Sequence, residues 1–373
     1  MIAQLAFAFL ASAGLAAFIL LTRSVHLHLT GSDRHEGPQH MQLQRLPRVG
    51  GLAVFIGFFI AVGVARFFGY ISAPTQSMAN TLGLCSLPVV IAGLLEDLSN
   101  RVRPLWRMLA AFVAAMLAVY LLGANIHSLH LAFFDKWLSQ YGWISCAITL
   151  LSIAGLVHAM NIIDGLNGLL GGVCLLIFAA LGLAANRAED TLLTNICVLC
   201  FGVTAGFFGF NFPKAKLISG DGGAYFLGFM IALLSVLLVQ RNPAISPWFP
   251  LLLASYPITE TLFSIIRRLI KGSKISGADN RHLHSLMAFS LKEKHQAGHR
   301  VFLGFNAGAS IRCMGLALFG AVSAWVFVDD VPMLQWMCLG FVLLYLLIFY
   351  NETKKQMLSP YSEVSKSGSA TLP

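Results

Sequence analysis

Acidic and amide side chains are concentrated in three short, glycine-rich segments of the sequence. These residues are Glu96 and Asp97 in the first segment, Asn161, Asp164 and Asn167 in the second, and Asn211 and Asp221 in the third. Carboxylate and amide oxygens are suitable ligands for a hard divalent cation. Glycine, which has no Cβ, lets the backbone approach a phosphate closely. The residue types therefore predict a site that holds a divalent metal ion and a phosphorylated substrate.

Asp164 and Asp221 have the most informative surroundings. Asp164 lies in Asn-Ile-Ile-Asp-Gly-Leu-Asn-Gly, which combines side-chain oxygens with glycine turns between two apolar runs. Asp221 stands among three glycines at the expected start of a helix, where backbone N–H groups bind anions and a carboxylate can hold a metal that bridges to phosphate. The structural alternatives are that Asp221 caps this helix and that Glu96 and Asp97 mark the membrane–water interface.

Two basic loops add cationic groups to the candidate site. One contains Arg281-His282-Leu283-His284, and the other contains Pro47-Arg48-Val49-Gly50-Gly51. Histidine can ligate a metal, transfer a proton or form a hydrogen bond with phosphate. The alternative for the His-x-His is that it has no functional role in its basic loop.

The composition indicates what must position these loops. Of 373 residues, 57% are apolar and 11% are charged, against about 45–50% and about 25% in ordinary soluble domains. Apolar runs of the length needed to cross a hydrocarbon core of about 30 Å recur along the chain. They lack the alternation of barrel strands. The composition therefore excludes a soluble globular enzyme and predicts an all-α, polytopic membrane protein.

The apolar runs predict 11 transmembrane helices. Their approximate ranges are 2–22, 50–70, 80–96, 105–123, 143–161, 168–186, 192–210, 223–240, 247–266, 309–328 and 332–350. We expect residues 1–350 to form one transmembrane catalytic domain. The polar tail, residues 351–373, is expected to be disordered and cytoplasmic.

Charge predicts the orientation of these helices. If the N-terminus is outside, all but four of the 25 lysines and arginines fall on the inside, the exceptions being Arg66, Lys136, Arg187 and Arg241. This distribution obeys the positive-inside rule. The predicted cytoplasmic active-site loops are then 23–49, 96–107, 161–168, 211–223 and 267–308, and the C-terminus is cytoplasmic.

These segments together resemble one enzyme family. The chain is similar to the polyprenyl-phosphate N-acetylhexosamine-1-phosphate transferases, or glycosyltransferase family 4, which includes phospho-N-acetylmuramoyl-pentapeptide transferase. The resemblance covers about residues 2–350. Its motifs occur in the family's order: Pro47 to Gly51, Glu96-Asp97, Asn161 to Gly172, Asn211 to Gly223, and Asp279 to His284.

The resemblance implies a reaction and a set of site residues. It implies that Asp221 and Asp97 hold Mg²⁺, with Mn²⁺ as the alternative ion. Catalytic roles are implied for Asp97, Asp164, Asp221, His282 and His284, and substrate contacts for Arg48, Glu96, Asn161, Asn167, Asn211 and Arg281. Which acids ligate metal and which act on the lipid phosphate stays open.

The implied substrates are a UDP-sugar and a polyprenyl phosphate such as undecaprenyl phosphate. The single His-x-His resembles the branch that initiates O-antigen, teichoic acid and related glycans, which favours a UDP-N-acetylhexosamine such as UDP-N-acetylglucosamine as donor. Transfer of the sugar 1-phosphate yields polyprenyl-diphospho-sugar and UMP. The implied location is a bacterial inner membrane, with a homodimer compatible with the family and no nucleic acid as partner.

Two other functions stay open at this point. A secondary transporter also has many helices with scattered acids and glycines, and Glu260 is an acid inside an apolar run. However, most acids lie at helix ends or in loops, and no repeat is evident by eye. An inactive relative that acts as a scaffold is the other alternative, because Glu96 and Asn167 stand where the family usually or often has aspartate.

Overall fold

The computed structural model describes residues 1–30, 46–272, 281–296, 298, 300–301 and 303–358. Within these ranges all regular secondary structure is α-helical. The helices are α1 (Ile2–Leu21), α2 (Arg23–Thr30), α3 (Gly50–Phe67), α4 (Ala73–Cys85), α5 (Leu87–Ser99), α6 (Pro104–Leu122), α7 (Ala132–Gln140), α8 (Gly142–Ile162), α9 (Leu169–Arg187), α10 (Thr191–Asn211), α11 (Gly220–Arg241), α12 (Trp248–Leu253), α13 (Ser255–Ile270), α14 (Leu283–Gln296), α15 (Gly304–Val326) and α16 (Val331–Leu358).

Nine of the described helices are long and apolar enough to cross a membrane: α1, α3, α6, α8, α9, α10, α11, α15 and α16. The bent pair of α4 and α5, which meet at 44°, is a tenth candidate span. The prediction of an all-helical, polytopic membrane protein is thus confirmed.

The predicted number of 11 uniform spans is corrected by two helix breaks. The predicted helix 80–96 is a bent pair that begins at Ala73, and Pro88 lacks the N–H that would bond back to Leu84 across the break. The predicted helix 247–266 is divided at Ala254 into α12 and α13. Pro257 likewise lacks the donor that would bond to Leu253, so neither piece is long enough to count as a span alone.

The C-terminal prediction also needs a correction. Helix α16 continues to Leu358, so the first eight residues of the segment expected to be disordered are helical. The remainder of that segment, residues 359–373, lies outside the described residues, as do residues 31–45 and 273–280 of two predicted active-site loops.

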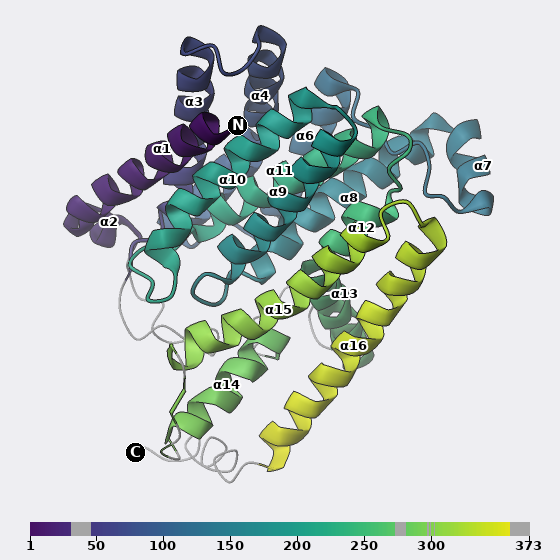
Figure 1. Ribbon diagram of the computed structural model, residues 1–373. Coiled ribbons are helices and arrows are strands. Elements are labelled where there is room, and N and C mark those ends of the chain that lie inside the picture. The colour runs from purple at the N-terminus through teal and green to yellow at the C-terminus, as the bar shows by residue number, and fades with distance from the viewer. Residues whose placement is uncertain (31–45, 273–280, 297, 299, 302, 359–373) are drawn as a thin grey trace.

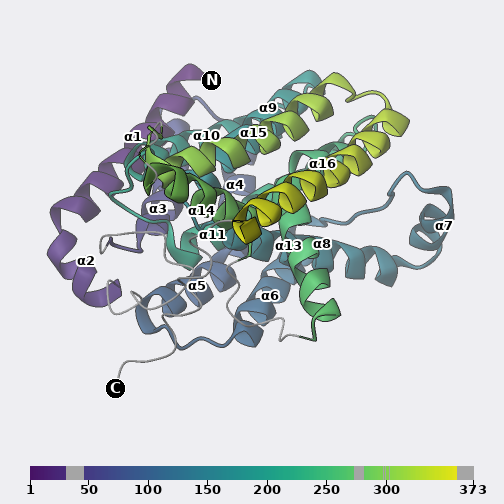
Figure 2. The same ribbon diagram turned by 90° about the horizontal axis from the view of Figure 1, so that it is seen from below.

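Helix α11 is the most enclosed of these candidate spans, because 89% of its most apolar 18-residue stretch is buried inside the protein. It packs against α3, α5, α8 and α9, and it lies inside the bundle in Figure 1 and Figure 2. Glycines permit the closest approaches, because a Cβ on Gly51 of α3 would overlap Gly223, and a Cβ on Gly93 of α5 would overlap Gly222. Small residues let membrane helices meet at the backbone. The first turn of α11 is therefore held directly between α3 and α5.

The C-terminal helices α12 to α16 form a second group beside this bundle (Figure 1). Helix α15 packs on α9, α13 packs on α8, and α14 lies along α15. This arrangement places the start of α14, which carries the histidine motif, next to the loop between α8 and α9.

Candidate active site

Asp97 caps the central helix. Its Oδ1 accepts a hydrogen bond from the backbone N–H of Asp221 at 3.0 Å, and its Oδ2 accepts one from the N–H of Gly222 at 3.1 Å. The Asp97 side chain is 1% exposed. Gly220 just before these donors has φ of +72°, and a Cβ there would meet both Asp97 and the Arg48 carbonyl. The start of α11 is thus built on a buried carboxylate from α5, with a turn that requires glycine.

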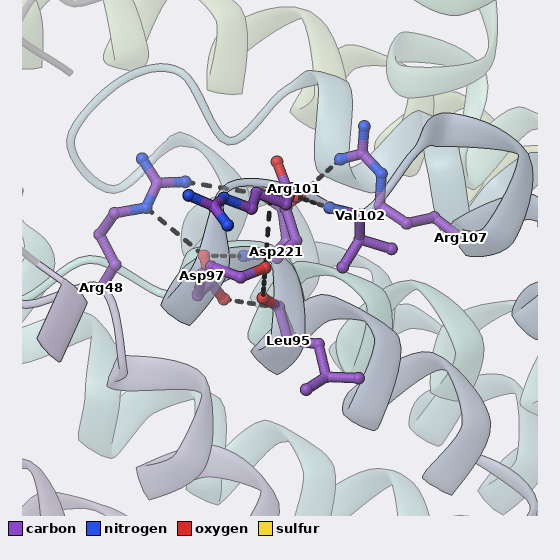
Figure 3. A network of polar contacts seen from close by, with 10 residues as sticks. Arg48, Leu95, Asp97, Arg101, Val102, Arg107 and Asp221 are labelled. Atoms are coloured by element: carbon purple, nitrogen blue, oxygen red, sulfur yellow. Dashed lines mark hydrogen bonds and ion pairs between the residues drawn. The ribbon is translucent and has the colours of Figure 1, made fainter. Parts of the chain in front are cut away.

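Asp221 lies between two arginines, which approach it from opposite sides in Figure 3. The Arg107 Nη1 atom is 2.8 Å from its Oδ2, and the Arg48 Nη2 atom is 3.5 Å from its Oδ1. Arg48 Nε also lies 3.4 Å from Asp97 Oδ1. The side chain of Asp221 is 12% exposed, against 1% for Asp97. Of the two carboxylates, Asp221 is the one that a ligand can reach.

The Pro47–Gly51 motif is held in place by backbone pairing with the segment before α11. The N–H of Ile218 donates to the Pro47 carbonyl at 3.0 Å, and the N–H of Gly50 donates back to the Ile218 carbonyl at 2.8 Å. Gly51 N–H bonds to the Ser219 carbonyl at 2.7 Å. These bonds position Arg48 beside both Asp97 and Asp221.

Asp164 joins the same cluster from the loop between α8 and α9. Its Oδ2 accepts a hydrogen bond from the Ser219 hydroxyl. The pKa of Asp164 is raised to about 7, mainly because burial desolvates the carboxyl group; the Ser219 hydrogen bond and Arg48 oppose this shift, and nearby Asp221 and Asp97 add to it. The structure thus brings together the three aspartates that the sequence singled out.

The predicted amides mainly organise the loops around this cluster. Asn211 is buried, and its Oδ1 accepts from the Gly168 N–H at 2.6 Å while its Nδ2 donates to the Leu217 carbonyl at 2.8 Å. Asn167 donates to the Pro213 carbonyl at 3.1 Å. Both side chains therefore tie the α8–α9 loop to the segment before α11.

Two further predicted residues flank the cluster. Glu96 Oε2 accepts a hydrogen bond from the Val102 N–H at 2.9 Å, which closes the turn between α5 and α6. Asn161 occupies the last turn of α8, where its carbonyl accepts from the Asp164 N–H at 3.2 Å. Glu96 is buried, whereas Asn161 is partly exposed.

The histidine motif is organised by Glu260 of α13. Glu260 Oε1 lies 3.1 Å from His282 Nδ1 and accepts from the Leu283 N–H at 3.0 Å, while Oε2 lies 4.0 Å from His284 Nδ1. The two imidazole rings stack, with centroids 5.3 Å apart. A Cβ on Gly165 would lie 2.7 Å from His284 Nε2, so this ring lies directly against the Asp164 loop.

The neighbours of the histidine motif are only partly described. The carbonyl of Arg281 accepts a hydrogen bond from Arg267 at 2.7 Å. Asp279 and Asn280, which open the motif, lie outside the described residues.

Three contributors were missed or undervalued by the sequence reasoning. In the sequence alone, Arg107 is one of the inside positive charges, Glu260 is an acid in an apolar run, and Ser219 has no distinguishing pattern. Arg107 and Asp221 are 114 positions apart, so no local pattern links them. An arginine at the start of a membrane helix, and an acid within one, were the available signals.

The donor set fits a hard divalent cation. Among the described residues, no group of three or more His, Cys, Asp and Glu side chains forms a ready-made metal site. Mg²⁺, however, is commonly held by one or two carboxylates together with substrate phosphates and water. Asp221 has remaining lone pairs beside its two arginine contacts. Asp97 is buried, and both of its oxygens already accept backbone hydrogen bonds, which makes it the poorer ligand.

Comparison with known proteins identifies similar sequences. The model of the family described as "Glycosyl transferase family 4" matches residues 79–239. The chain is 30% identical over 265 residues to a "Probable undecaprenyl-phosphate N-acetylglucosaminyl 1-phosphate transferase" of Bacillus subtilis, covering 70% of this chain and 71% of the relative. It is 27% identical to an "Undecaprenyl-phosphate alpha-N-acetylglucosaminyl 1-phosphate transferase" of Salmonella typhi, covering 72% of each chain. The protein of the same description from Yersinia pestis is 26% identical, with 88% and 86% covered.

Proposed function

Because the chain belongs to glycosyl transferase family 4, we propose that it transfers N-acetylhexosamine 1-phosphate from a UDP-sugar to undecaprenyl phosphate. The products are undecaprenyl-diphospho-N-acetylhexosamine and UMP. The observation that carries this proposal at the level of the site is the cluster at the start of α11, where Asp221 lies between Arg48 and Arg107.

The reaction requires the site to offset the negative charge of both reactants. A phosphate oxygen of the lipid attacks the β-phosphorus of the UDP-sugar, and the bond from that phosphorus to the bridging oxygen breaks, so that UMP leaves. Both reactants are anionic, and phosphoryl transfer is accelerated mainly by positioning and by stabilising charge. Arg48 and Arg107 supply two permanent positive charges where the candidate site opens. Their N–H groups can donate to phosphate oxygens.

Asp221 is the proposed ligand for Mg²⁺, with Mn²⁺ as the alternative. Such an ion, when bound, would offset charge on the diphosphate and on the departing UMP. We assign Asp97 the role of holding the first turn of α11 in place, since its oxygens are engaged with backbone donors. Asp164, bonded to Ser219, connects this turn to the loop that we propose contacts the nucleotide.

The histidine motif is proposed to bind phosphate or sugar from the other side of the Asp164 loop. His282 directs its Nδ1 atom at Glu260, and its Nε2 atom is on the opposite side of the ring. Glu260 thereby orients the ring, so that Nε2 can form a hydrogen bond with a phosphate oxygen or a sugar hydroxyl.

The site is proposed to face the cytoplasm, where UDP-sugars are found. Helices α3, α9 and α11 begin at the site and carry Arg66, Arg187 and Arg241 in their last turns, away from it. Gln4 near the N-terminus donates to the Tyr70 carbonyl, beyond the far end of α3. With the site inside, the N-terminus is then outside and residues 1–350 form the catalytic domain of an inner-membrane enzyme.

A donor panel tests this function. Purified protein, undecaprenyl phosphate and Mg²⁺ are mixed with individual UDP-sugars, and the lipid products are measured by mass spectrometry. We expect a product whose mass equals that of the acceptor plus one N-acetylhexosamine phosphate, together with equimolar UMP. A folded protein that forms neither a lipid-linked product nor UMP from any donor would instead favour the transporter or scaffold alternatives.

A further inference from the structure

An open cavity outside the candidate active site is lined by α14, α15 and residues 300–301 between them. It has a volume of about 570 Å³, and its lining includes three cationic residues, Lys294, Arg300 and Arg312, and three apolar ones, Leu291, Val301 and Ile311. We call it the α14–α15 cavity. The two helices lie side by side (Figure 1). Lys294 follows His284 by ten residues on α14, which is about 15 Å along a helix, so the cavity is separate from the histidine motif.

The three cations lack an acidic partner within the described part of the chain. The ion pairs found there involve other arginines and lysines, such as Arg187 with Asp329 and Lys355 with Glu352. Lys294, Arg300 and Arg312 are all exposed. Three like charges around one cavity repel each other, so an anion bound among them would be stabilised by all three.

Arg312 has a position that a membrane protein must compensate. It is the ninth residue of α15, a candidate membrane span, and therefore lies about 12 Å along the helix from its first residue. A charged side chain on a membrane helix is costly unless it reaches a polar or charged partner. A phosphate at the membrane surface is within the reach of such a side chain, because long arginine side chains extend toward the interface.

The outward face of α15 indicates where that phosphate comes from. Ile311, Leu318 and Val322 recur at helical spacing and are 40%, 47% and 52% exposed. Phe319, one heptad after Arg312, is 44% exposed. Arg312 therefore points to the same side as the apolar side chains that face acyl chains when α15 is in a membrane.

We propose that the α14–α15 cavity binds the phosphate of an anionic membrane lipid. The headgroup phosphate lies among Lys294, Arg300 and Arg312, and an acyl chain runs along Ile311 and Leu318. Basic pockets beside membrane helices are suited to anionic headgroups. The continuous apolar stripe below the cations favours a lipid over a soluble phosphate.

Lipid binding by defined variants tests the assignment. Purified protein in a zwitterionic detergent is titrated with fluorescent phosphatidylglycerol, and phosphatidylcholine with the same label serves as the comparison. We expect tighter binding of phosphatidylglycerol and about fivefold weaker binding after Arg312→Gln. The double substitution Arg300→Gln with Arg312→Gln should weaken it further, whereas Arg312→Lys should keep it. Lys354→Gln, which removes one exposed charge from the end of α16, is the matched control and should change nothing.

Competition distinguishes the two sources of phosphate. Unlabelled phosphatidylglycerol should displace the fluorescent lipid, and inorganic phosphate at the same concentration should not. Asp221→Asn should bind the lipid like the wild type, so this result is independent of the proposed transferase activity. Equal binding by wild type and the double variant, equal binding of both lipids, or displacement by inorganic phosphate would each overturn the proposal.

Discussion

Replacing Asp97 by Asn separates helix capping from metal binding. Asparagine keeps one oxygen acceptor but presents an NH₂ group in place of the other, so one of the two N–H donors of Asp221 and Gly222 loses its partner. Asp97 is 1% exposed, and water has little access to that donor. An unsatisfied buried hydrogen-bonding group costs about 1–3 kcal/mol. Asp97→Ala removes both acceptors and should cost about twice that range.

These losses are large compared with the total stability of a folded domain, about 5–15 kcal/mol. The assay is denaturant unfolding of the purified protein in detergent, followed by intrinsic fluorescence, with turnover measured on the same samples. We expect Asp97→Asn to lower stability, and Asp97→Ala to lower it more.

The matched control is Asp135→Asn, at a second carboxylate that accepts backbone hydrogen bonds. Asp135 bonds to the N–H groups of Leu129 and Leu131 at the start of α7, on the opposite side of the membrane from the site in our assignment. It should lose stability but retain turnover under conditions where it stays folded. An Asp97→Asn protein with unchanged unfolding, and with turnover as low as that of Asp221→Asn, would refute the capping role.

The remaining predictions concern packing, positioning and pH. Gly93→Ala places a Cβ against the backbone of α11 and should sharply reduce the yield of folded protein. Gly209→Ala is the control, because the space around its Cβ is open, and it should fold normally. Size-exclusion chromatography compares the two yields. Glu260→Gln should lower turnover at least about tenfold, since His282 loses the carboxylate that orients it; unchanged turnover in a folded variant would argue against this role. Burial opposes ionisation of Asp190, but hydrogen bonds from Arg241 and Leu193 outweigh it and lower the pKa. The stabilisation from ionised Asp190 should therefore be present above its unfolded pKa of about 3.9 and be lost as pH falls through the lower folded pKa. Thermal unfolding measured across this pH range should show a smaller loss of stability for Asp190→Asn than for the wild type.

The fold class was predictable because it depends on the lengths of apolar runs. Breaks within those runs were harder to predict. A window of about 20 residues averages over Pro88 and Pro257, although each proline removes one helix hydrogen bond. The extension of α16 past residue 350 had a local signal that polarity obscured, since Glu352, Lys354 and Lys355 are good helix formers.

The candidate site was predictable in its residue types but less so in its roles. Asp97, Asp164 and Asp221 stood out because acids beside glycines are suited to phosphate chemistry. The capping role of Asp97 was hidden, because its partner Asp221 is 124 positions away in the chain. Arg107 was hidden for the same reason. Which carboxylate caps a helix and which faces a ligand depends on how α5, α6 and α11 pack.

The most direct test of sugar-1-phosphate transfer at Asp221 is the turnover of Asp221→Asn, measured as lipid-linked product and UMP at saturating Mg²⁺. Asparagine preserves the size of the side chain and removes the charge between Arg48 and Arg107. The account predicts a folded protein whose turnover falls at least about 100-fold, the scale of losing one preorganised electrostatic contact, with only partial rescue by added Mg²⁺. A variant that keeps most of the wild-type turnover at ordinary Mg²⁺ would contradict the assignment of Asp221.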